Sequence, residues 1–169
     1  MRRKLAVGLA LACFGTFAQA ETYLYSSALN AFQEVPQTNS QGVGVISLTL
    51  DDSDLTASGT GLVFFLSGSP TDFHIHNAPF GSSGPVALAI GPSAFSGNDI
   101  AFDITLPSVA AFNALKAILD AENGYFNIHT AAFPSGEIRG QIASVVPEPA
   151  TMAVIGLGLL GVIKRRKAA

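Results

Sequence analysis

The strongest constraint on this chain is a pair of alternating segments, residues 124–130 and 137–142, separated by a turn that contains Pro, Ser and Gly. In each segment, apolar residues or glycine occupy every second position and polar residues fill most of the positions between them. Such alternation on both sides of a turn is typical of a β-hairpin with one buried face. Because a slip by one residue would reverse every side chain, the polar pattern also predicts the register. The predicted cross-strand pairs are His129 with Glu137, Asn127 with Arg139, and Ile128 with Ile138.

Residues 72–76 repeat this design, with two apolar side chains facing the core and the polar side chains facing the other way. The histidines of this strand, His74 and His76, would leave the same face about 6–7 Å apart, at ~3.3 Å per residue. That spacing allows both imidazoles to reach one ion, and imidazole suits copper or zinc. The third and last histidine of the chain is His129, on the polar face of the hairpin. We therefore consider His74, His76 and His129 as metal ligands, with a copper or zinc ion as the cofactor.

An architectural role is the alternative interpretation of these histidines. Each could be a partly buried, neutral imidazole that hydrogen-bonds to a carboxylate or a carbonyl and holds the hairpin and residues 77–85 in place. Glu137 and Arg139 lie two residues apart on one face and are interpreted as a structural polar pair. The chain contains no Gly-x-Ser-x-Gly motif and no Walker motif. No catalytic residue is assigned, and we expect a protein that is not an enzyme.

The N-terminal residues 1–20 differ from the rest of the chain in composition. They combine a basic start, a short apolar run and an Ala-Gln-Ala sequence, which together predict a secretory signal peptide. The mature chain would begin at Glu21. Because Cys13 is the only cysteine and lies in this segment, disulfide bonds and thiolate chemistry are excluded from the mature protein.

The C-terminal residues 146–169 contain Pro147, Glu148 and Pro149, then an apolar run over 150–163, and then a basic cluster. As a helix, this run would span about 21 Å at ~1.5 Å per residue. A hydrocarbon core is roughly 30 Å thick, so the run is a marginal transmembrane helix. The basic cluster would stay in the cytoplasm by the positive-inside rule, which leaves the domain outside. We expect a membrane anchor that is either transient or retained.

Between these ends, residues 21–145 are expected to form one domain. The pattern indicates seven or eight short strands at turn spacings of about 8–12 residues, which is typical of an antiparallel β-sandwich with Greek-key-like connections. One short α-helix is predicted to begin after Ser108 as its N-cap and to end at Gly124. A bulge is expected near Ile46. Residues 62–66 are apolar at every position, which predicts a central or covered strand.

The charge of this domain limits its partners. Residues 21–145 contain eleven acidic side chains and only two basic ones, Lys116 and Arg139, so their formal net charge is −9. A domain this acidic is repelled by nucleic acid and by anionic lipid, so no nucleic-acid partner is expected. Cations, or a matrix cross-linked by cations, are compatible with it.

Three segments also resemble a known family. Residues 74–86 and 125–142 resemble the two signature blocks of the CHRD domain, a domain that takes its name from chordin, and residues 28–36 are similar to its N-terminal block. The resemblance covers about residues 25–143. One departure is Asn77, where many members have a glycine. The C-terminal segment resembles a PEP-CTERM sorting signal, which implies an exosortase-type processing enzyme and a bacterium that makes extracellular polysaccharide.

These features predict a secreted, exosortase-sorted CHRD-domain protein of the cell surface or of the extracellular polysaccharide matrix of a biofilm. The expected role is adhesive or structural. Two alternatives stay open: a copper- or zinc-binding extracellular protein or enzyme that uses the three histidines, and a binding module for a protein ligand by analogy with chordin. Residues 73–76 also resemble the copper-ligand strand of Cu/Zn superoxide dismutases. That activity is not expected, because it requires more histidines than the three in this chain.

Overall fold

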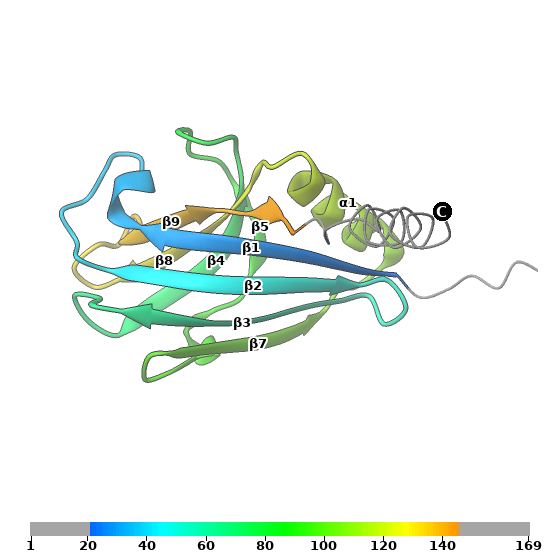
Figure 1. The fold of residues 1–169 in the computed structure, drawn as a ribbon, viewed down its shortest axis with the longest axis horizontal. Coiled ribbons are helices and arrows are strands. Elements are labelled where there is room, and N and C mark those ends of the chain that lie inside the picture. Colours follow the sequence, from blue (N-terminus) through cyan, green and yellow to red (C-terminus); the bar gives the residue numbers. More distant parts are fainter. Residues whose placement is uncertain (1–20, 146–169) are drawn as a thin grey trace, which may run out of the picture.

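The computed structural model describes residues 21–145, which form one antiparallel β-sheet and one α-helix (Figure 1). The strands are β1 Thr22–Asn30, β2 Val43–Asp51, β3 Thr56–Phe64, β4 Pro70–Asn77, β5 Val86–Ala89, β6 Phe95–Ser96, β7 Asp99–Thr105, β8 Gly124–Thr130, β9 Ile138–Gln141 and β10 Ala143–Ser144. The helix is α1 Val109–Asp120, and two 3₁₀ turns are η1 Ala31–Gln33 and η2 Pro92–Ala94. None of the helices in residues 21–145 has the length and apolar character to cross a membrane. The predicted signal peptide and C-terminal anchor lie outside the described residues.

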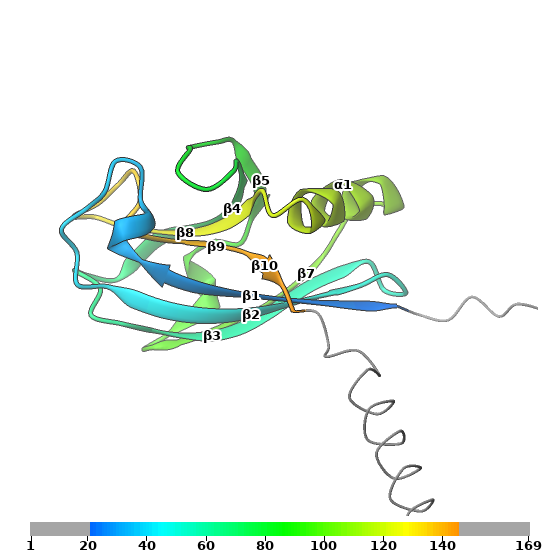
Figure 2. The same ribbon diagram turned by 45° about the horizontal axis from the view of Figure 1, so that its top comes forward.

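The sheet has the strand order β5-β4-β8-β9-β1-β2-β3-β7-β6, and the short β10 pairs with β1. It curls so that β4, β8 and β9 lie over β1, β2 and β3 (Figure 2). The two layers of the sandwich are therefore the two halves of one hydrogen-bonded sheet. The predicted antiparallel all-β fold with a single helix is confirmed.

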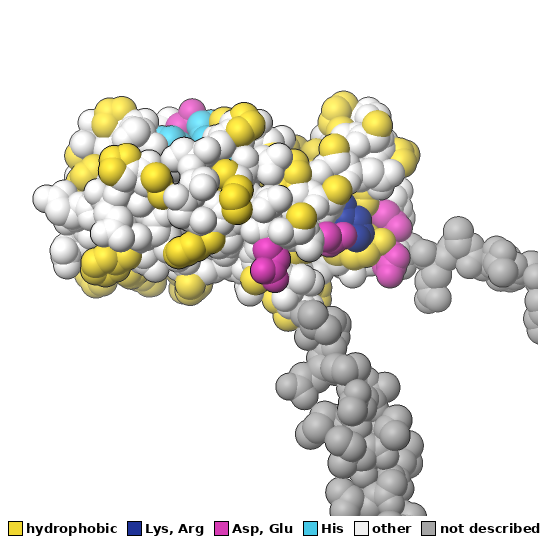
Figure 3. Space-filling view, turned by 90° about the horizontal axis from the view of Figure 1, so that it is seen from above, with side chains coloured by type: hydrophobic (Ala, Val, Ile, Leu, Met, Phe, Trp, Pro, Cys, Tyr) yellow, Lys and Arg dark blue, Asp and Glu magenta, His cyan; other side chains and the backbone are white. Residues whose placement is uncertain are grey.

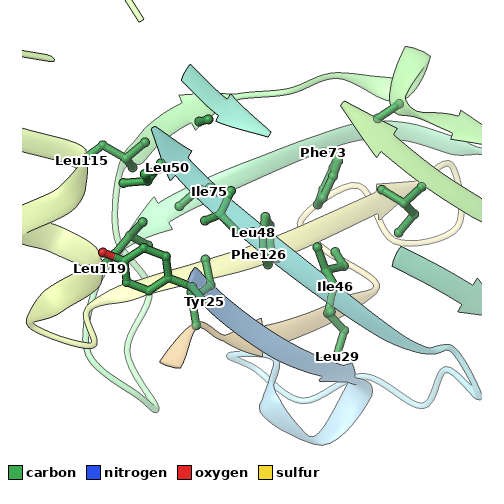
Figure 4. Packing of buried hydrophobic residues seen from close by; sticks show 14 of the residues in the cluster. Tyr25, Leu29, Ile46, Leu48, Leu50, Phe73, Ile75, Leu115, Leu119 and Phe126 are labelled. Atoms are coloured by element: carbon green, nitrogen blue, oxygen red, sulfur yellow. The ribbon is translucent and has the colours of Figure 1, made fainter. Parts of the chain in front are cut away.

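The core lies between these two layers, and its side chains are almost completely buried. Phe73 and Phe126 have no exposed surface, and their rings stack with centroids 5.5 Å apart (Figure 4). Leu48 and Leu50 of β2 approach from the opposite layer and are equally buried. Each fully buried side chain of this size stabilises the fold by about 1.5–3 kcal/mol. The period-two alternation therefore gives the sheet one apolar face, and this face is buried between the two layers when the sheet curls.

Helix α1 covers one end of this core. Ser108 is its N-cap, as predicted, and its Oγ accepts a hydrogen bond of 3.2 Å from the backbone N–H of Ala111. Phe112, Leu115 and Leu119 are the buried residues of the helix, and their spacing is that of one helical face.

The predicted helix end at Gly124 is wrong. The helix ends at Asp120, and Glu122 adopts the left-handed conformation with φ 55°. The backbone N–H of Asn123 then bonds to the carbonyl of Ile118 at 3.0 Å. Gly124 instead begins β8, where a Cβ atom would stand 2.5 Å from Leu119 Cδ2. Glycine is needed there because strand and helix approach closely, not because of the backbone conformation.

Of two further expectations about the sheet, one is wrong and the other is confirmed in part. β2 pairs with β1 and β3 over all nine residues without a shift of register, so there is no bulge near Ile46. Residues 62–66 were expected to be central or covered. β3 is a central strand, between β2 and β7, and Val63 is buried, but Leu62 is 40% and Phe64 39% exposed. Both lie on the outer face of the sheet, opposite Val45 and Val43 of β2. These apolar cross-strand pairs contact each other rather than the core.

Candidate metal centre

The three histidines lie on two neighbouring strands, β4 and β8. The pairing of these strands sets Phe73 opposite Ile128 and Ile75 opposite Phe126, and all four side chains are fully buried. The residues between them must therefore point to the other face of the sheet. His74, His76 and His129 lie on that face, as the alternation predicts.

The hairpin register is confirmed for two of the three predicted pairs. β8 and β9 set Asn127 opposite Arg139 and Ile128 opposite Ile138. The ladder ends there, because the backbone N–H of Glu137 donates to the carbonyl of Ile128 at 2.7 Å. The predicted pairing of His129 with Glu137 is wrong. The residue opposite His129 is Asp72, on β4.

The three imidazoles converge on one point. Each offers one ring nitrogen, and these three nitrogens all lie within 4.8 Å of one another. Nδ1 of His74 and Nε2 of His129 are separated by 3.3 Å. Nitrogens that bind one zinc ion at about 2.0–2.1 Å in tetrahedral geometry are themselves about 3.4 Å apart. The geometry is therefore close to that of a three-histidine centre.

The outer nitrogen of each ring contacts a group that only accepts hydrogen bonds. His74 Nε2 lies 3.0 Å from Asp72 Oδ1, His76 Nδ1 lies 2.9 Å from the Gly84 carbonyl, and His129 Nδ1 lies 3.0 Å from the Pro134 carbonyl. An acceptor at this distance requires the N–H on that nitrogen. In a neutral ring, the inner nitrogen then carries a lone pair. Metal-binding histidines have the same arrangement, since they donate their second N–H to a carboxylate or a carbonyl.

The surroundings also favour neutral imidazoles. Burial lowers the pKa of His74, and this outweighs the opposite effect of the nearby Asp72 carboxylate. Burial likewise lowers the pKa of His76, although the hydrogen bond to Gly84 opposes the change. The inner nitrogen of His76 is buried and has no hydrogen-bond partner. The neutral ring is the form that binds a metal ion.

A stack of two side chains, Tyr125 and then Arg139, packs against the ring of His76. Its ring is nearly parallel to that of Tyr125, with centroids 5.0 Å apart, and the guanidinium of Arg139 lies 3.4 Å from the Tyr125 ring centroid. Arg139 also donates to the carbonyls of Ser82 at 2.6 Å and Pro79 at 3.3 Å. The loop over residues 77–85 is thereby held against the histidines.

Glu137 belongs to a separate network. Its side chain has no exposed surface and accepts hydrogen bonds from Ser40 Oγ at 2.6 Å, from the Ser67 backbone N–H at 2.7 Å and from Thr130 Oγ1 at 2.6 Å. Burial raises the pKa of Glu137, but these hydrogen bonds outweigh it and the net shift is downward. Within residues 21–145, Glu137 and Arg139 form no ion pair with each other. The expected structural pair is therefore not formed, and Glu137 and Arg139 each stabilise the fold through separate hydrogen bonds.

Sequence reasoning missed the groups that orient the histidines. Asp72 lies on the polar face of its strand, so the alternation could have indicated it. Gly84 and Pro134 contribute only backbone carbonyls, and Tyr125 contributes a ring face, for which a single sequence carries no signal. The histidines are partly buried, and some of their atoms reach the surface beside an acidic side chain (Figure 3).

Comparison with known proteins gives two family matches. The model of the CHRD domain matches residues 25–142, which include all three histidines, and the model of the PEP-CTERM protein-sorting motif matches residues 145–167. No curated protein and no solved structure matches the chain. The sorting motif implies processing by exosortase, a membrane protease, and indicates a secreted protein that is sorted to the cell surface. Because the first match spans well over half of the sequence, the chain belongs to the CHRD domain family.

Proposed function

We propose that this surface protein binds one zinc or copper ion through His74, His76 and His129. The observation that carries the proposal is the 3.3 Å separation of two inner nitrogens, His74 Nδ1 and His129 Nε2, whose rings both direct their N–H elsewhere. Two lone pairs at this distance repel each other unless a proton or a cation lies between them. Because burial disfavours the protonated form of His74, a metal ion between the two nitrogens is more favourable than a proton.

The donor set determines which ions are suitable. Three imidazoles and no thiolate favour zinc or copper over calcium or magnesium, which prefer oxygen ligands. Three protein ligands also leave one coordination position open, as in zinc sites that exchange a water or another ligand. We propose a binding role rather than catalysis. The adhesive or structural role predicted from the sequence is compatible with such a site, and binding of a protein ligand stays a prediction.

Elemental analysis tests the proposal directly. The secreted protein is purified at neutral pH without a histidine tag, and its metal content is measured before and after dialysis against zinc and copper. We expect about one ion per chain, held against a chromophoric chelator of micromolar affinity. A folded protein that retains neither ion would overturn the proposal and leave the histidines with an architectural role.

Substitutions separate the ligands from their supports. His129→Ala is the most informative ligand variant, since His129 is only partly buried and one of its nitrogens faces a surface carbonyl. It should lose metal uptake and keep the far-ultraviolet circular dichroism of the folded protein. His76→Ala should also lose uptake, and unfolding of that variant in a protein that never holds metal would favour the architectural interpretation.

The Asp72 carboxylate, which accepts a hydrogen bond from His74, allows a test by partial loss of metal affinity. Asp72→Asn removes the charge that holds the His74 ring, and loss of such a supporting group weakens metal binding by about 10–100-fold. Asp103→Asn is the matched control, because Asp103 is an exposed aspartate on β7. Equal affinities of the two variants would show that Asp72 does not orient a ligand.

A further inference from the structure

We infer that the open position of this ion takes a carboxylate from an acidic polysaccharide, so that the ion joins the domain to the polymer. The inference rests on the metal centre proposed above and names its partner. It follows from the charges of the domain, from the exposure of the centre and from the chemistry of the remaining coordination position.

Within residues 21–145, no basic side chain is free to bind an anionic polymer. These residues contain only Lys116 and Arg139 as basic side chains. Lys116 pairs with Asp120 on the next turn of α1, and its ammonium also lies over the ring of Tyr23. Arg139 is 1% exposed and bonds to loop carbonyls. An anionic polymer therefore finds no ordinary cation on this part of the chain.

A bound ion would change this at one place. Three neutral imidazoles add no negative charge, so the ligands themselves would not reduce the charge of a divalent ion, and the Asp72 carboxylate behind His74 would offset only part of it. Zinc completes four-coordination with one ligand beyond the three nitrogens, and carboxylate oxygen is one of its usual ligands. The three histidines are only partly buried, with 16% of the His74 side chain exposed, so the centre lies at the surface of the domain (Figure 3).

The acidic side chains of the domain are placed so that they oppose this contact little. On the face shown in Figure 3, acidic side chains gather at the end far from the histidines, and acidic atoms also lie next to the histidines. Asp72 contacts the histidines directly, and its carboxylate already accepts the His74 N–H. At physiological salt, charges further away than about 8 Å are largely screened. The acidic domain can thus approach a polyanion at the metal centre.

A polysaccharide suits this position better than an acidic peptide. The carboxylate of a uronic acid is attached directly to a rigid sugar ring, so binding orders fewer bonds than it would for a glutamate side chain. A polymer with one carboxylate per sugar also offers many equivalent ligands to a domain held at the cell surface, which raises the effective concentration. The sorting motif directs this chain to that location.

The first experiment looks at the coordination position itself. The purified protein is loaded with cobalt(II), whose visible spectrum reports its ligands, and is titrated with galacturonate and then with uncharged galactose. We expect galacturonate to change the spectrum in a saturable manner and galactose to leave it unchanged. A spectrum that does not respond to galacturonate would overturn the inference, although the cobalt spectrum itself would still support the metal centre.

The second experiment measures binding to the polymer. Zinc-loaded protein, metal-free protein and His129→Ala protein at the same free zinc are each sedimented with polygalacturonate, dextran and polyglutamate, and zinc content is verified in parallel. We expect at least about tenfold more zinc-loaded protein with polygalacturonate than in either control, and no binding to dextran. Equal sedimentation of the metal-free protein would overturn the inference, and equal binding to polyglutamate would overturn the choice of a polysaccharide. Failure to load zinc at all would instead refute the proposed metal centre.

Discussion

Replacement of Glu34 by glutamine should remove a large pH dependence of stability. Glu34 follows η1 and is 5% exposed, and its Oε1 has no hydrogen-bond partner. Burial raises its pKa to about 7 from the usual 4.5, although the charge of Arg139 and the backbone N–H of Val35 act in the opposite direction. Glu34→Gln keeps the size of the side chain and removes the ionisation.

The sign and size of the effect follow from linkage. Because the folded-state pKa lies above the unfolded one, Glu34 contributes its full stability below pH 4.5 and loses it as the pH rises through about 7. At about 1.4 kcal/mol per pH unit, the difference between these two pKa values corresponds to about 3 kcal/mol. The wild-type protein should therefore lose about 3 kcal/mol relative to the variant between acidic and mildly alkaline pH.

Urea unfolding of both proteins at about pH 4 and pH 8 measures this quantity, since these values lie outside most of the transition. Other groups that titrate in this interval, including the histidines, contribute to both proteins and cancel in the comparison. We expect the free energy of unfolding of the variant, relative to that of the wild type, to be about 3 kcal/mol higher at pH 8 than at pH 4. If the free-energy difference between the proteins is the same at both pH values, Glu34 is ionised in the fold at the same pH as in the unfolded chain, and the reasoning from its burial is wrong.

Three other substitutions test the packing and the caps by thermal or urea unfolding. Phe73→Ala should cost about 3–5 kcal/mol, because it leaves a cavity beside Phe126, whereas Thr71→Ala at an exposed position of β4 should change stability little. Ser108→Ala should cost about 1 kcal/mol through the lost N-cap, and an unchanged helix stability would contradict that role. Glu137→Gln should cost at least about 2 kcal/mol at neutral pH, since three donors face the carboxylate. Its cost should shrink in acid, because the pKa of Glu137 is lowered and its contribution is lost as the pH falls through that value; a cost that does not depend on pH would refute this.

The alternation of the strands was readable from the sequence because it reports only local geometry. Successive residues of a strand point to opposite faces, so Phe126 and Ile128 had to be buried together, with His129 on the other face. The pairing of Asn127 with Arg139 follows from the same rule. The N-cap of α1 at Ser108 was equally local, since it depends on a hydrogen bond to the third residue along.

Predictions failed where a side chain could find its hydrogen-bond partners or its burial in more than one place. Glu137 was expected opposite His129, but its carboxylate is bonded by Ser40 and Ser67, which are 97 and 70 residues away in the sequence. The apolar run over residues 62–66 was expected to be central or covered. Its strand is central in the sheet, yet Leu62 and Phe64 lie uncovered on the outer face. A hydrophobic residue indicates that burial is favourable, but only the packing of the whole chain decides which face of the sheet is buried under another layer.

The candidate metal centre combines both kinds of information. The spacing of His74 and His76 on one strand placed two imidazoles on one face before any fold was known. The arrival of His129, 55 residues further on, depends on β4 and β8 being neighbours in the curled sheet. The acceptors that orient the rings depend on the same neighbourhood, since Gly84 and Pro134 offer only their backbone carbonyls. Local backbone geometry fixes the direction of each side chain, whereas burial of the entire core decides which strands lie together, and so whether three histidines become one site.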